Sequence, residues 1–398
     1  MREITITDAR IFRGKTGFAK GSLHVSGSRI RSVIPESEER CEYPGSRIRL
    51  PGRYIIPGLV DIHTHGNSGF DFSDGTREGL ERIGRYLAAH GITSFAPTSM
   101  TFPYEKLETA FRTAAEYGND RPAGGARIIG IHMEGPFLSE KKKGAQNRKY
   151  LKQPDAEMFF RLQEACGHAI RIVDVAPELE GAEEFIRRVS EDCRVSVGHT
   201  EASYAETLRA FEAGASHVTH LFNAMPPVHH REPGVIGAAF EKRKVVVELI
   251  CDGLHVHPNV IRMAFRLFPG RICMVSDSLR CCGMPDGEYE LGGQQITLQN
   301  GQARLPDGNL AGAVSDLYED MVRAIHYGIP AEDAILAATM IPAKEAGAET
   351  EIGSLEVGKK ADFIVCDENW NLEQVFIDGV RVTEVPDAAG TEIITEES

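Results

Sequence analysis

Short apolar runs alternate with amphipathic helical patterns through the middle of this chain, and this alternation constrains its fold most. Arg77–Ala89 has helical spacing of its apolar residues, and Gly91, a residue type that often ends helices, follows it. Glu105–Tyr117 and Tyr204–Ala213 also precede a glycine. An α/β fold is therefore predicted, with eight parallel strands in a (β/α)₈ barrel of the TIM type. The strand candidates are Leu59–His63, Ile92–Pro97, Ile128–Met133, Ile170–Ala176, Val195–Gly198, Ser216–Thr219, Val245–Ile250 and Ile272–Ser276.

The two ends of the chain have a different pattern, in which short β-like runs alternate with turns. Ile4–Thr7 and Arg29–Ile34 are examples near the start, and Gln374–Val382 surrounds a hairpin turn near the end. These ends predict a small β-sandwich built from residues 1–56 and 355–398, beside a barrel of residues 57–354. Gly287–Gly312 interrupts the alternation and predicts an inserted β-hairpin.

The composition narrows the choice of partners. The 398 residues suit one barrel with a small accessory domain. Lys and Arg number 44 against 58 Asp and Glu, and a formal net charge of -14 argues against a nucleic-acid or anionic-membrane partner. No apolar run has the length of a membrane span. The eight Cys residues form no Cys-x-x-Cys pair, so a reducing cytoplasm is the expected compartment.

Six potential metal ligands lie at the C-terminal ends of five predicted strands. Parallel barrels carry their catalytic groups at these strand ends. Imidazoles and carboxylates together are the ligands of hydrolytic Zn²⁺ or Fe²⁺ sites, so the pattern predicts a metal-dependent hydrolase. The six residues are His63, His65, Glu134, His199, His220 and Asp277.

Each of these residues also has a simpler interpretation. The two histidines of His63-x-His65 could be polar loop residues, and the chain has a second such pair at His255-x-His257. His199 could cap a helix, and Asp277 could form a turn. Glu134 could equally be a solvated carboxylate, and His220 a hydrogen-bonded core histidine. Their joint position at strand ends favours the metal site over these separate explanations.

Two further residues on the same predicted face could bind an anionic substrate. Arg231 follows the sixth strand candidate and His255 follows the seventh. A surface salt bridge and a surface histidine are the alternatives. Lys141-Lys-Lys-Gly144 is interpreted as a solvated charge run or a mobile loop rather than as a binding patch.

Several segments, in this order, resemble the amidohydrolase superfamily and, within it, the deacetylases of N-acetylated amino-sugar phosphates. The resemblance covers nearly the whole chain, and its most specific stretch is Thr219-His-Leu-Phe-Asn-Ala-Met225. Where the family usually has Thr-Asp-Ala, this chain has Ser276-Asp277-Ser278, a departure that bears on substrate preference. Other matching segments are Pro57–Gly66, Glu134–Leu138, Lys143–Asn147, Gly198–Thr200, Arg231–Gly234 and Asp252–Val256.

The resemblance implies a reaction and a set of ligands. The reaction removes acetate from N-acetyl-D-glucosamine 6-phosphate to give D-glucosamine 6-phosphate in amino-sugar catabolism. One or two divalent ions per chain, Zn²⁺ or Fe²⁺, would assist it, and Asp277 would transfer the proton. One ion would be held by Glu134, His199 and His220, and the second by His63, His65 and Asp277 with Glu134 shared between them.

The resemblance also implies the substrate contacts and a homodimer that shares its phosphate site across the interface. The contacts would be Gln146, Asn223, Ala224, Arg231 and His255. The alternative substrate is a related amino-sugar phosphate such as N-acetylgalactosamine 6-phosphate. Two rival functions are less favoured: a cyclic-amide hydrolase, because the fourth strand leads into Ala176-Pro-Glu178 without a lysine, and a metal-free assembly protein, because all six ligands are present.

Overall fold

A barrel of parallel strands forms the centre of the molecule. The computed structural model describes residues 2–38 and 45–382. The barrel strands follow the order β10-β9-β11-β12-β13-β14-β15-β16, and β6 pairs with β9. They are β6 (Leu59–Thr64), β9 (Ile92–Ser99), β10 (Arg127–Ile128), β11 (Ile131–Met133), β12 (Ile170–Val175), β13 (Arg194–Val197), β14 (His217–Val218), β15 (Val246–Ile250) and β16 (Ile272–Val275).

The predicted barrel is confirmed, with one difference in the third strand. That strand is split into β10 and β11, and both pieces pair with β9. The first and last strands meet beyond their regular ladders: Asp277 N donates to His63 O at 2.9 Å, and His65 N donates to Ser278 O at 2.9 Å. These two bonds bring three of the predicted ligands to one seam of the barrel.

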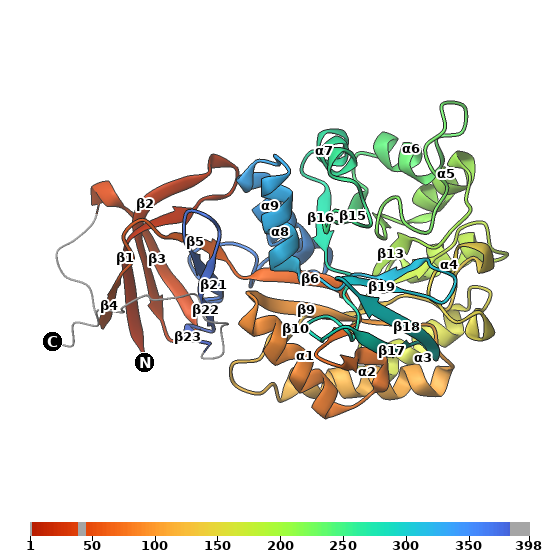
Figure 1. Cartoon of the computed structure of the whole chain (residues 1–398), viewed down its shortest axis with the longest axis horizontal. Coiled ribbons are helices and arrows are strands. Elements are labelled where there is room, and N and C mark those ends of the chain that lie inside the picture. The colour runs from red at the N-terminus through yellow and green to blue at the C-terminus, as the bar shows by residue number, and fades with distance from the viewer. Residues whose placement is uncertain (1, 39–44, 383–398) are drawn as a thin grey trace.

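Amphipathic helices cover the outside of the barrel (Figure 1). The start of α5 has a capping box, in which Ser203 and Glu206 satisfy each other's backbone N–H groups. Gly91 adopts a φ of +84° just after α1, as expected of a residue that ends a helix. The helices are α1 (Arg77–Ala89), α2 (Tyr104–Asn119), α3 (Ala156–Ala165), α4 (Ala182–Val189), α5 (Tyr204–Ala213), α6 (Gly234–Glu241), α7 (Pro258–Leu267), α8 (Leu317–His326), α9 (Ala331–Ala337) and α10 (Met340–Glu345). None of the described helices is long and apolar enough to cross a membrane.

Strands from both termini share one eight-stranded sheet that forms the β-sandwich at the side of the barrel (Figure 1). β5 pairs with β21, so the start and end of the described chain meet there. The last part of the predicted sandwich segment, residues 383–398, lies outside the described residues. The strands are β1 (Glu3–Phe12), β2 (Phe18–Ser26), β3 (Arg29–Pro35), β4 (Ser46–Arg49), β5 (Tyr54–Pro57), β21 (Phe363–Cys366), β22 (Leu372–Ile377) and β23 (Val380–Arg381).

A charged bridge joins the sandwich to the barrel. Arg127 in β10 donates to Asp362 at 2.7 Å and to Asp378 at 2.9 Å, and both acceptors flank terminal strands. Gly58 links β5 directly to β6, where a Cβ atom would lie 2.2 Å from Thr93 Oγ1. The sandwich therefore fixes the start of β6, the strand that contains His63 and leads into His65.

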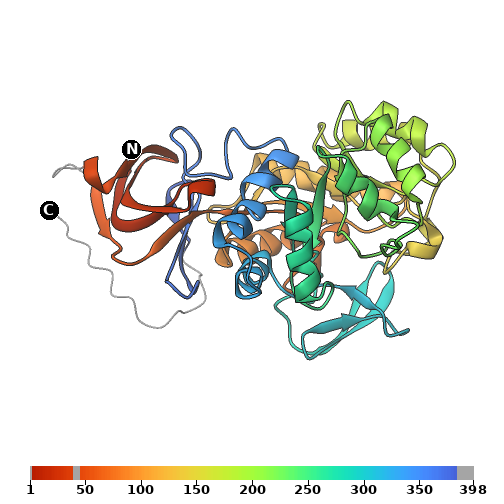
Figure 2. The same ribbon diagram turned by 90° about the horizontal axis from the view of Figure 1, so that it is seen from above.

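The predicted insertion is confirmed as antiparallel β-structure and is larger than a single hairpin. Four strands form it, and it lies to one side of the barrel (Figure 2). Asn147 Nδ2 donates to Gly292 O at 3.1 Å, which fastens the insertion to the loop after β11. The strands are β17 (Gly287–Leu291), β18 (Gln294–Gln299), β19 (Gln302–Arg304) and β20 (Leu310–Gly312); the short strands β7 (Gly66–Asn67) and β8 (Phe70–Asp71) form a separate hairpin.

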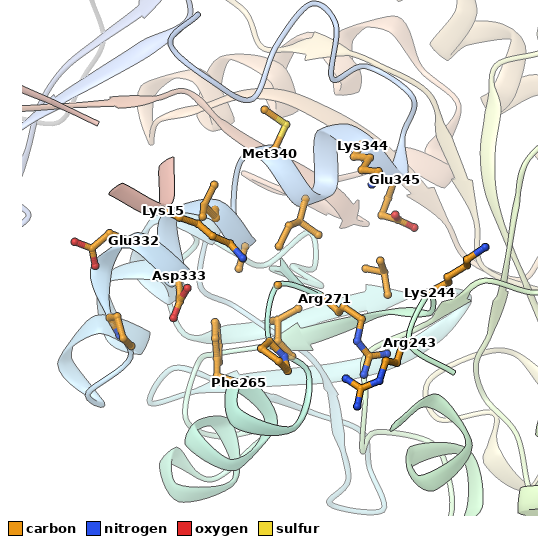
Figure 3. Close-up of a pocket in the computed structure, with 18 of the residues that line it drawn as sticks. Lys15, Arg243, Lys244, Phe265, Arg271, Glu332, Asp333, Met340, Lys344 and Glu345 are labelled. Atoms are coloured by element: carbon orange, nitrogen blue, oxygen red, sulfur yellow. The ribbon is translucent and has the colours of Figure 1, made fainter. Parts of the chain in front are cut away.

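The barrel has a cavity at each end. At the N-terminal ends of the strands lies a cavity of about 1000 Å³, which contains none of the predicted metal ligands (Figure 3). At the C-terminal ends lies one of about 510 Å³, lined by His65, Glu134, His199, His220 and Asp277. The smaller cavity is the candidate active site, because catalytic groups of such barrels come from the C-terminal strand ends.

Candidate active site

The six predicted ligands come together at the C-terminal end of the barrel. His63 is fully buried, and His65, Glu134 and His220 are at most 3% exposed. His199 Nε2 lies 3.0 Å and His220 Nε2 lies 3.2 Å from Glu134 Oε1. Buried ionisable groups at this density need compensating charges or a bound cation.

Three of these residues adopt a left-handed backbone conformation just after their strands. The φ angles are +47° at His199, +27° at His220 and +51° at Asp277. Such a conformation costs about 1–3 kcal/mol for a residue with a side chain, and it persists where surrounding structure imposes it. Because it recurs at three strand ends, we infer that the surrounding structure imposes this conformation and that it directs the three side chains toward the shared cluster.

Hydrogen bonds donated by the Nδ1 atoms orient three of the four imidazoles. His65 Nδ1 lies 3.1 Å from Thr98 O, and His199 Nδ1 lies 2.7 Å from Lys142 O. His63 Nδ1 lies 2.8 Å from Glu248 Oε2. Carbonyl and carboxylate oxygens only accept, so each Nδ1 carries hydrogen and each Nε2 is available to a metal when the ring is neutral.

The spacing of the ligand atoms fits a divalent metal. Two groups of buried ligands share Glu134: one with His63 and His65, the other with His199 and His220. Their Nε2–carboxylate distances run from 3.0 to 3.5 Å. Ligands about 2.0–2.1 Å from a tetrahedral Zn²⁺ lie roughly 3.3 Å apart, close to this spacing.

The surroundings of the Nε2 atoms of three histidines also indicate a metal site. The Nε2 atoms of His199 and His220 face each other at 3.1 Å. His63 Nε2 is buried and has no hydrogen-bond partner among the described residues. Asp277 Oδ1 approaches His65 Nε2 at 3.3 Å and His63 Nε2 at 3.5 Å, which adds a carboxylate to the first group. The donor set therefore fits one or two ions.

The electrostatics of the cluster keep both carboxylates ionised. Burial raises the pKa of Glu134, but His199, His220 and His63 outweigh it and hold that pKa well below its usual value. Burial also raises the pKa of Asp277, and His63 and His65 lower it further than burial raises it. Burial lowers the pKa of His65, but Asp277 and Glu134 raise it to about 10. The negative charge of Asp277 and Glu134 that stabilises the charged ring of His65 is the same charge that would attract a metal cation.

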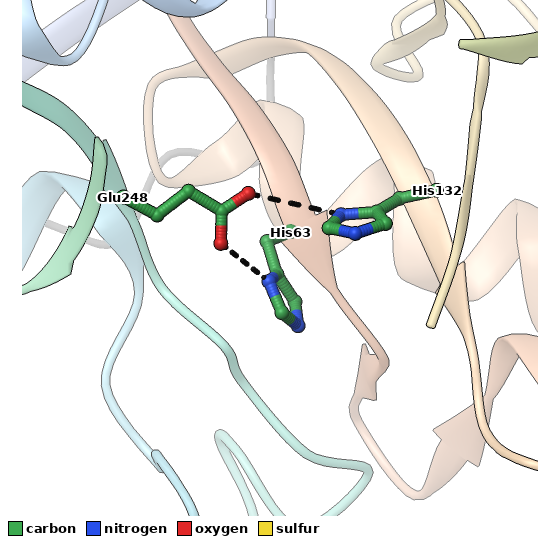
Figure 4. Close-up of side chains that lie close together, drawn as sticks. All are labelled: His63, His132 and Glu248. Carbon is green, nitrogen blue, oxygen red and sulfur yellow. Dashed lines mark hydrogen bonds and ion pairs between the residues drawn. The ribbon is translucent and has the colours of Figure 1, made fainter. Parts of the chain in front are cut away.

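A carboxylate behind the site, Glu248 of β15, supports both ligand groups. Figure 4 shows its contact with His63 Nδ1. Besides His63 Nδ1, it accepts from the backbone N–H of His220 at 3.1 Å. Glu248 is fully buried. Burial raises its pKa, but His63, His217 and His132 lower it well below its usual value. It therefore acts as a buried anion that orients one ligand side chain and one ligand backbone.

Two more histidines surround Glu248. His217 Nε2 lies 3.2 Å from Glu248 Oε1, and His217 Nδ1 lies 3.0 Å from Glu345 Oε2. Burial lowers the pKa of His217, but these two carboxylates raise it to about 9. His132 has one ring nitrogen 3.0 Å from Ile62 O and the other 2.9 Å from Asp174 Oδ1. Both nitrogens of His132 already face acceptors, so His63, His132 and Glu248 form a supporting network rather than another metal site.

Four of the five predicted substrate contacts line the same cavity: Gln146, Asn223, Ala224 and His255. Gln146 is buried, donates to Glu134 and accepts from Thr101 N at 2.7 Å. His255 Nδ1 donates to Asp252 Oδ2 at 2.6 Å. Burial lowers the pKa of His255, but Asp252 raises it above its usual value, so the ring suits an anionic ligand.

Arg231 is the predicted contact that the structure does not bring to the cavity of its own chain. It is exposed on the loop before α6 and lies 2.6 Å from His230 Nε2. The cavity lining does not include it. Any role of Arg231 at a phosphate therefore requires a second chain or a movement of this loop.

Sequence reasoning missed two parts of the cavity wall. Lys141–Gly144, interpreted from the sequence as a solvated charge run or a mobile loop, lines the cavity, although Lys141 pairs with Glu201 at 3.0 Å. Asp307 and Asn309 of the inserted sheet also line it. The break in β/α alternation located the insertion but gave no sign that it would fold over the strand ends.

Comparisons with known proteins agree with this geometry. The profile of the Amidohydrolase family matches residues 54–382, and the chain belongs to that family. It is 36% identical to N-acetylglucosamine-6-phosphate deacetylase of Bacillus subtilis (strain 168) over 370 residues, covering 91% of this chain and 92% of the relative. It is 33% identical to N-acetylgalactosamine-6-phosphate deacetylase of Escherichia coli O157:H7 over 340 residues, covering 84% of this chain and 89% of that relative.

The fold of this chain is also similar to a solved structure over nearly the full length of both chains. The Mycobacterium smegmatis N-acetyl-D-glucosamine-6-phosphate deacetylase, in complex with N-acetyl-D-glucosamine 6-phosphate, superimposes with a TM-score of 0.88 at 30% identity. The match covers 96% of this chain and 99% of that one. Barrel, sandwich and insertion thus belong to one shared architecture.

Glu248→Gln is expected to weaken metal binding by roughly 10–100-fold, the usual cost of losing a ligand-orienting partner. The amide keeps the shape but removes the negative charge that fixes His63. Titration of metal-free protein with Zn²⁺ would measure the affinity. Asp174→Asn is the matched control, because Asp174 is equally buried but bonds His132 and Thr219 rather than a metal ligand. Equal losses in both variants would contradict the assigned role of Glu248.

Proposed function

We propose that this protein hydrolyses the acetyl amide of N-acetyl-D-glucosamine 6-phosphate, releasing acetate and D-glucosamine 6-phosphate in amino-sugar catabolism. The observation that carries the proposal is the buried cluster of Glu134, His199 and His220 beside His63, His65 and Asp277, at the end of the barrel where such enzymes act. The similarity to the Bacillus subtilis and Mycobacterium smegmatis deacetylases supports it.

The second candidate substrate is N-acetylgalactosamine 6-phosphate. The Escherichia coli N-acetylgalactosamine-6-phosphate deacetylase favours it, because its identity to this chain is close to that of the Bacillus subtilis glucosamine relative. Ser278, which departs from the usual family pattern, does not decide between them. Its hydroxyl donates to Gly66 O at 3.0 Å and lies 2.8 Å from Thr64 Oγ1, and Ser278 does not line the cavity.

We infer that Zn²⁺ or Fe²⁺ binds at this cluster. Glu134, His199 and His220 would hold one ion. The side chains of His63, His65 and Asp277 would hold a second, with Glu134 shared. When bound, a divalent ion lowers the pKa of a water to about 7 and polarises an amide carbonyl.

Asp277 is the proposed proton carrier. Its carboxylate takes a proton from the attacking water as the water oxygen bonds to the carbonyl carbon. The C–N bond then breaks, and Asp277 returns the proton to the amine nitrogen, leaving acetate and a free amine. The lowered pKa of Asp277, which His63 and His65 maintain against burial, keeps the carboxylate ionised and ready to accept that proton.

Arg231 and His255 are the proposed phosphate contacts, and their placement supports a homodimer. His255 faces the cavity of its own chain, whereas Arg231 is exposed outside it. Two large apolar residues near them, Val228 and Leu254, are 56% and 48% exposed. A second copy packed on this surface would cover both and bring its Arg231 to the neighbouring cavity, where the guanidinium would pair with phosphate oxygens.

The substrate is tested by measuring amine release from a panel of N-acetyl sugars after Zn²⁺ reconstitution. We expect the glucosamine 6-phosphate compound to give the highest kcat/KM, with the unphosphorylated sugar much lower. A higher value for the galactosamine epimer would select the second candidate. Absence of amine release from both phosphates by metal-loaded protein would reject the proposed function.

Asp277→Asn should lower kcat by roughly 10²–10⁴-fold, because the amide cannot accept the proton. Asp307→Asn is the control, since Asp307 also lines the cavity but lies at its exposed rim. Metal content and the melting temperature should be measured on both variants to exclude a lost ion or a damaged fold. If Asp277→Asn keeps more than about a tenth of wild-type kcat, less than ~1.4 kcal/mol of barrier is at stake and the role of Asp277 fails.

Arg231→Ala should lower kcat/KM for the 6-phosphate by roughly ten- to a hundredfold, as expected for a lost charge-assisted bond of ~1.5–3 kcal/mol. The low activity on the unphosphorylated sugar should change little. Arg112→Ala, which removes an exposed arginine paired with Glu108 on α2, is the control. Equal losses on both sugars would show that Arg231 does not recognise the phosphate.

The same variant tests the shared site. The Arg231→Ala and Asp277→Asn proteins would be mixed so that their subunits exchange at random. About half of the dimers would then contain one subunit of each kind, and each mixed dimer would have one complete site out of two. Activity should therefore rise toward about a quarter of the wild-type value. No gain over the separate variants would place Arg231 in its own chain's site.

A further inference from the structure

The cavity at the N-terminal end of the barrel has no role in the proposed reaction. It is bounded by the starts of β13 to β16, by helices α9 and α10, and by Lys15 from the sandwich (Figure 3). Its volume is about 1000 Å³, the upper end of the range for small-molecule sites. The metal cluster lies at the opposite end of the barrel.

Positive side chains collect on one side of this cavity, in a chain whose net charge is -14. Arg243 and Lys244 come from the turn before β15, and Lys344 from α10 (Figure 3). All three are exposed and form no ion pair within the described part of the chain. Arg194 and Arg271 complete the basic side. Such a concentration of one sign focuses the field on the cavity and attracts anions.

The negative charge nearby only partly compensates the basic side. Glu345 is the acidic residue next to it; Arg194 Nε lies 3.7 Å from Glu345 Oε2, but that same oxygen bonds His217 Nδ1 at 3.0 Å. Arg271 uses its Nη1 on the carbonyls of Ala239, Lys242 and Val245. Burial lowers the pKa of Arg271, and the neighbouring positive charge of Arg243 lowers it further. The positive charge of the cluster is therefore only partly neutralised.

The rest of the cavity has two other surfaces. Apolar side chains of Phe265, Leu336, Met340 and Ile341 are half-buried along its wall. Glu332 and Asp333 lie beside Lys15 at the side away from Arg243 (Figure 3). A ligand that fills the cavity would thus meet cations at one end, an apolar wall in the middle and carboxylate acceptors at the other end.

We propose that this cavity binds a nucleoside phosphate. The phosphates would lie among Arg243, Lys244 and Lys344, where guanidinium and ammonium groups donate to their oxygens. The base would lie on the apolar wall beside Phe265. The hydroxyl and amino donors of the nucleoside would meet Glu332 and Asp333. This site does not depend on the substrate or metal of the active site.

The test is calorimetric titration of the full chain with ADP, with pyrophosphate and with adenosine. We expect one ADP per chain. Pyrophosphate should bind roughly tenfold or more weakly because it lacks the apolar part, and adenosine should give no measurable binding because it lacks the charge. Equal affinity for ADP and pyrophosphate would overturn the nucleoside assignment, and absence of saturable ADP binding would overturn the site.

Variants locate the binding. Arg243→Glu with Lys244→Glu should weaken ADP by roughly tenfold or more, since charge-assisted bonds become repulsions. Both side chains are exposed, so the fold should survive, and melting curves would verify it. Arg266→Glu with Lys20→Glu is the control, with the same charge change on exposed residues outside the cavity. Equal effects of the two double variants would place ADP elsewhere and overturn the proposal.

A third variant separates the two parts of the ligand. Phe265→Ala should weaken ADP binding and leave pyrophosphate binding unchanged, because it alters only the apolar wall. An unchanged ADP affinity would contradict the placement of the base.

Discussion

Two buried carboxylates, Glu134 and Glu248, determine how the catalytic end of the barrel is built. Leaving either charge uncompensated in the interior would cost several kcal/mol or more. Glu248 is compensated by His63 and His217 and by the backbone N–H of His220. These partners come from β6, β14 and the turn after β14, so one carboxylate ties together strands that are far apart in sequence. Glu134 is compensated by the histidines that face it, and the same geometry suits a metal cation.

The fold could be predicted largely because its signals are local. Helix periodicity followed by glycine located α1 and α5, and apolar runs located the barrel strands, since each depends on a few neighbouring residues. The third strand was predicted as continuous, whereas the structure divides it at residues 129–130. Nothing in the apolar pattern of Ile128–Met133 distinguishes a regular strand from one whose pairing with β9 is interrupted.

The candidate site was predictable where its residues stand at strand ends, as His199 and Asp277 do. Glu248 was not, because it lies within the apolar run Val246–Ile250, where a lone carboxylate has no partner visible in sequence. Its partners His63 and His217 are 185 and 31 residues away. The cationic cavity is harder still, since Lys15, Arg243 and Lys344 belong to three separate segments without a motif. Sequence patterns thus identify residues that occupy the same place in each strand–helix unit, such as the strand ends. Residues that meet only in the folded chain are found from the three-dimensional structure.

The two ends of the barrel are electrically distinct but physically joined. At one end, carboxylates and imidazoles form a cluster that suits a metal; at the other, cations that are only partly neutralised suit an anion. Glu345 lines the cationic cavity and bonds His217, which bonds Glu248, which in turn bonds His63 of the metal cluster. Each link is a hydrogen bond between side chains that are at most 5% exposed, where screening by solvent is weak. A change of charge at Glu345 therefore acts on a network that ends at a metal ligand, although the two cavities share no residue.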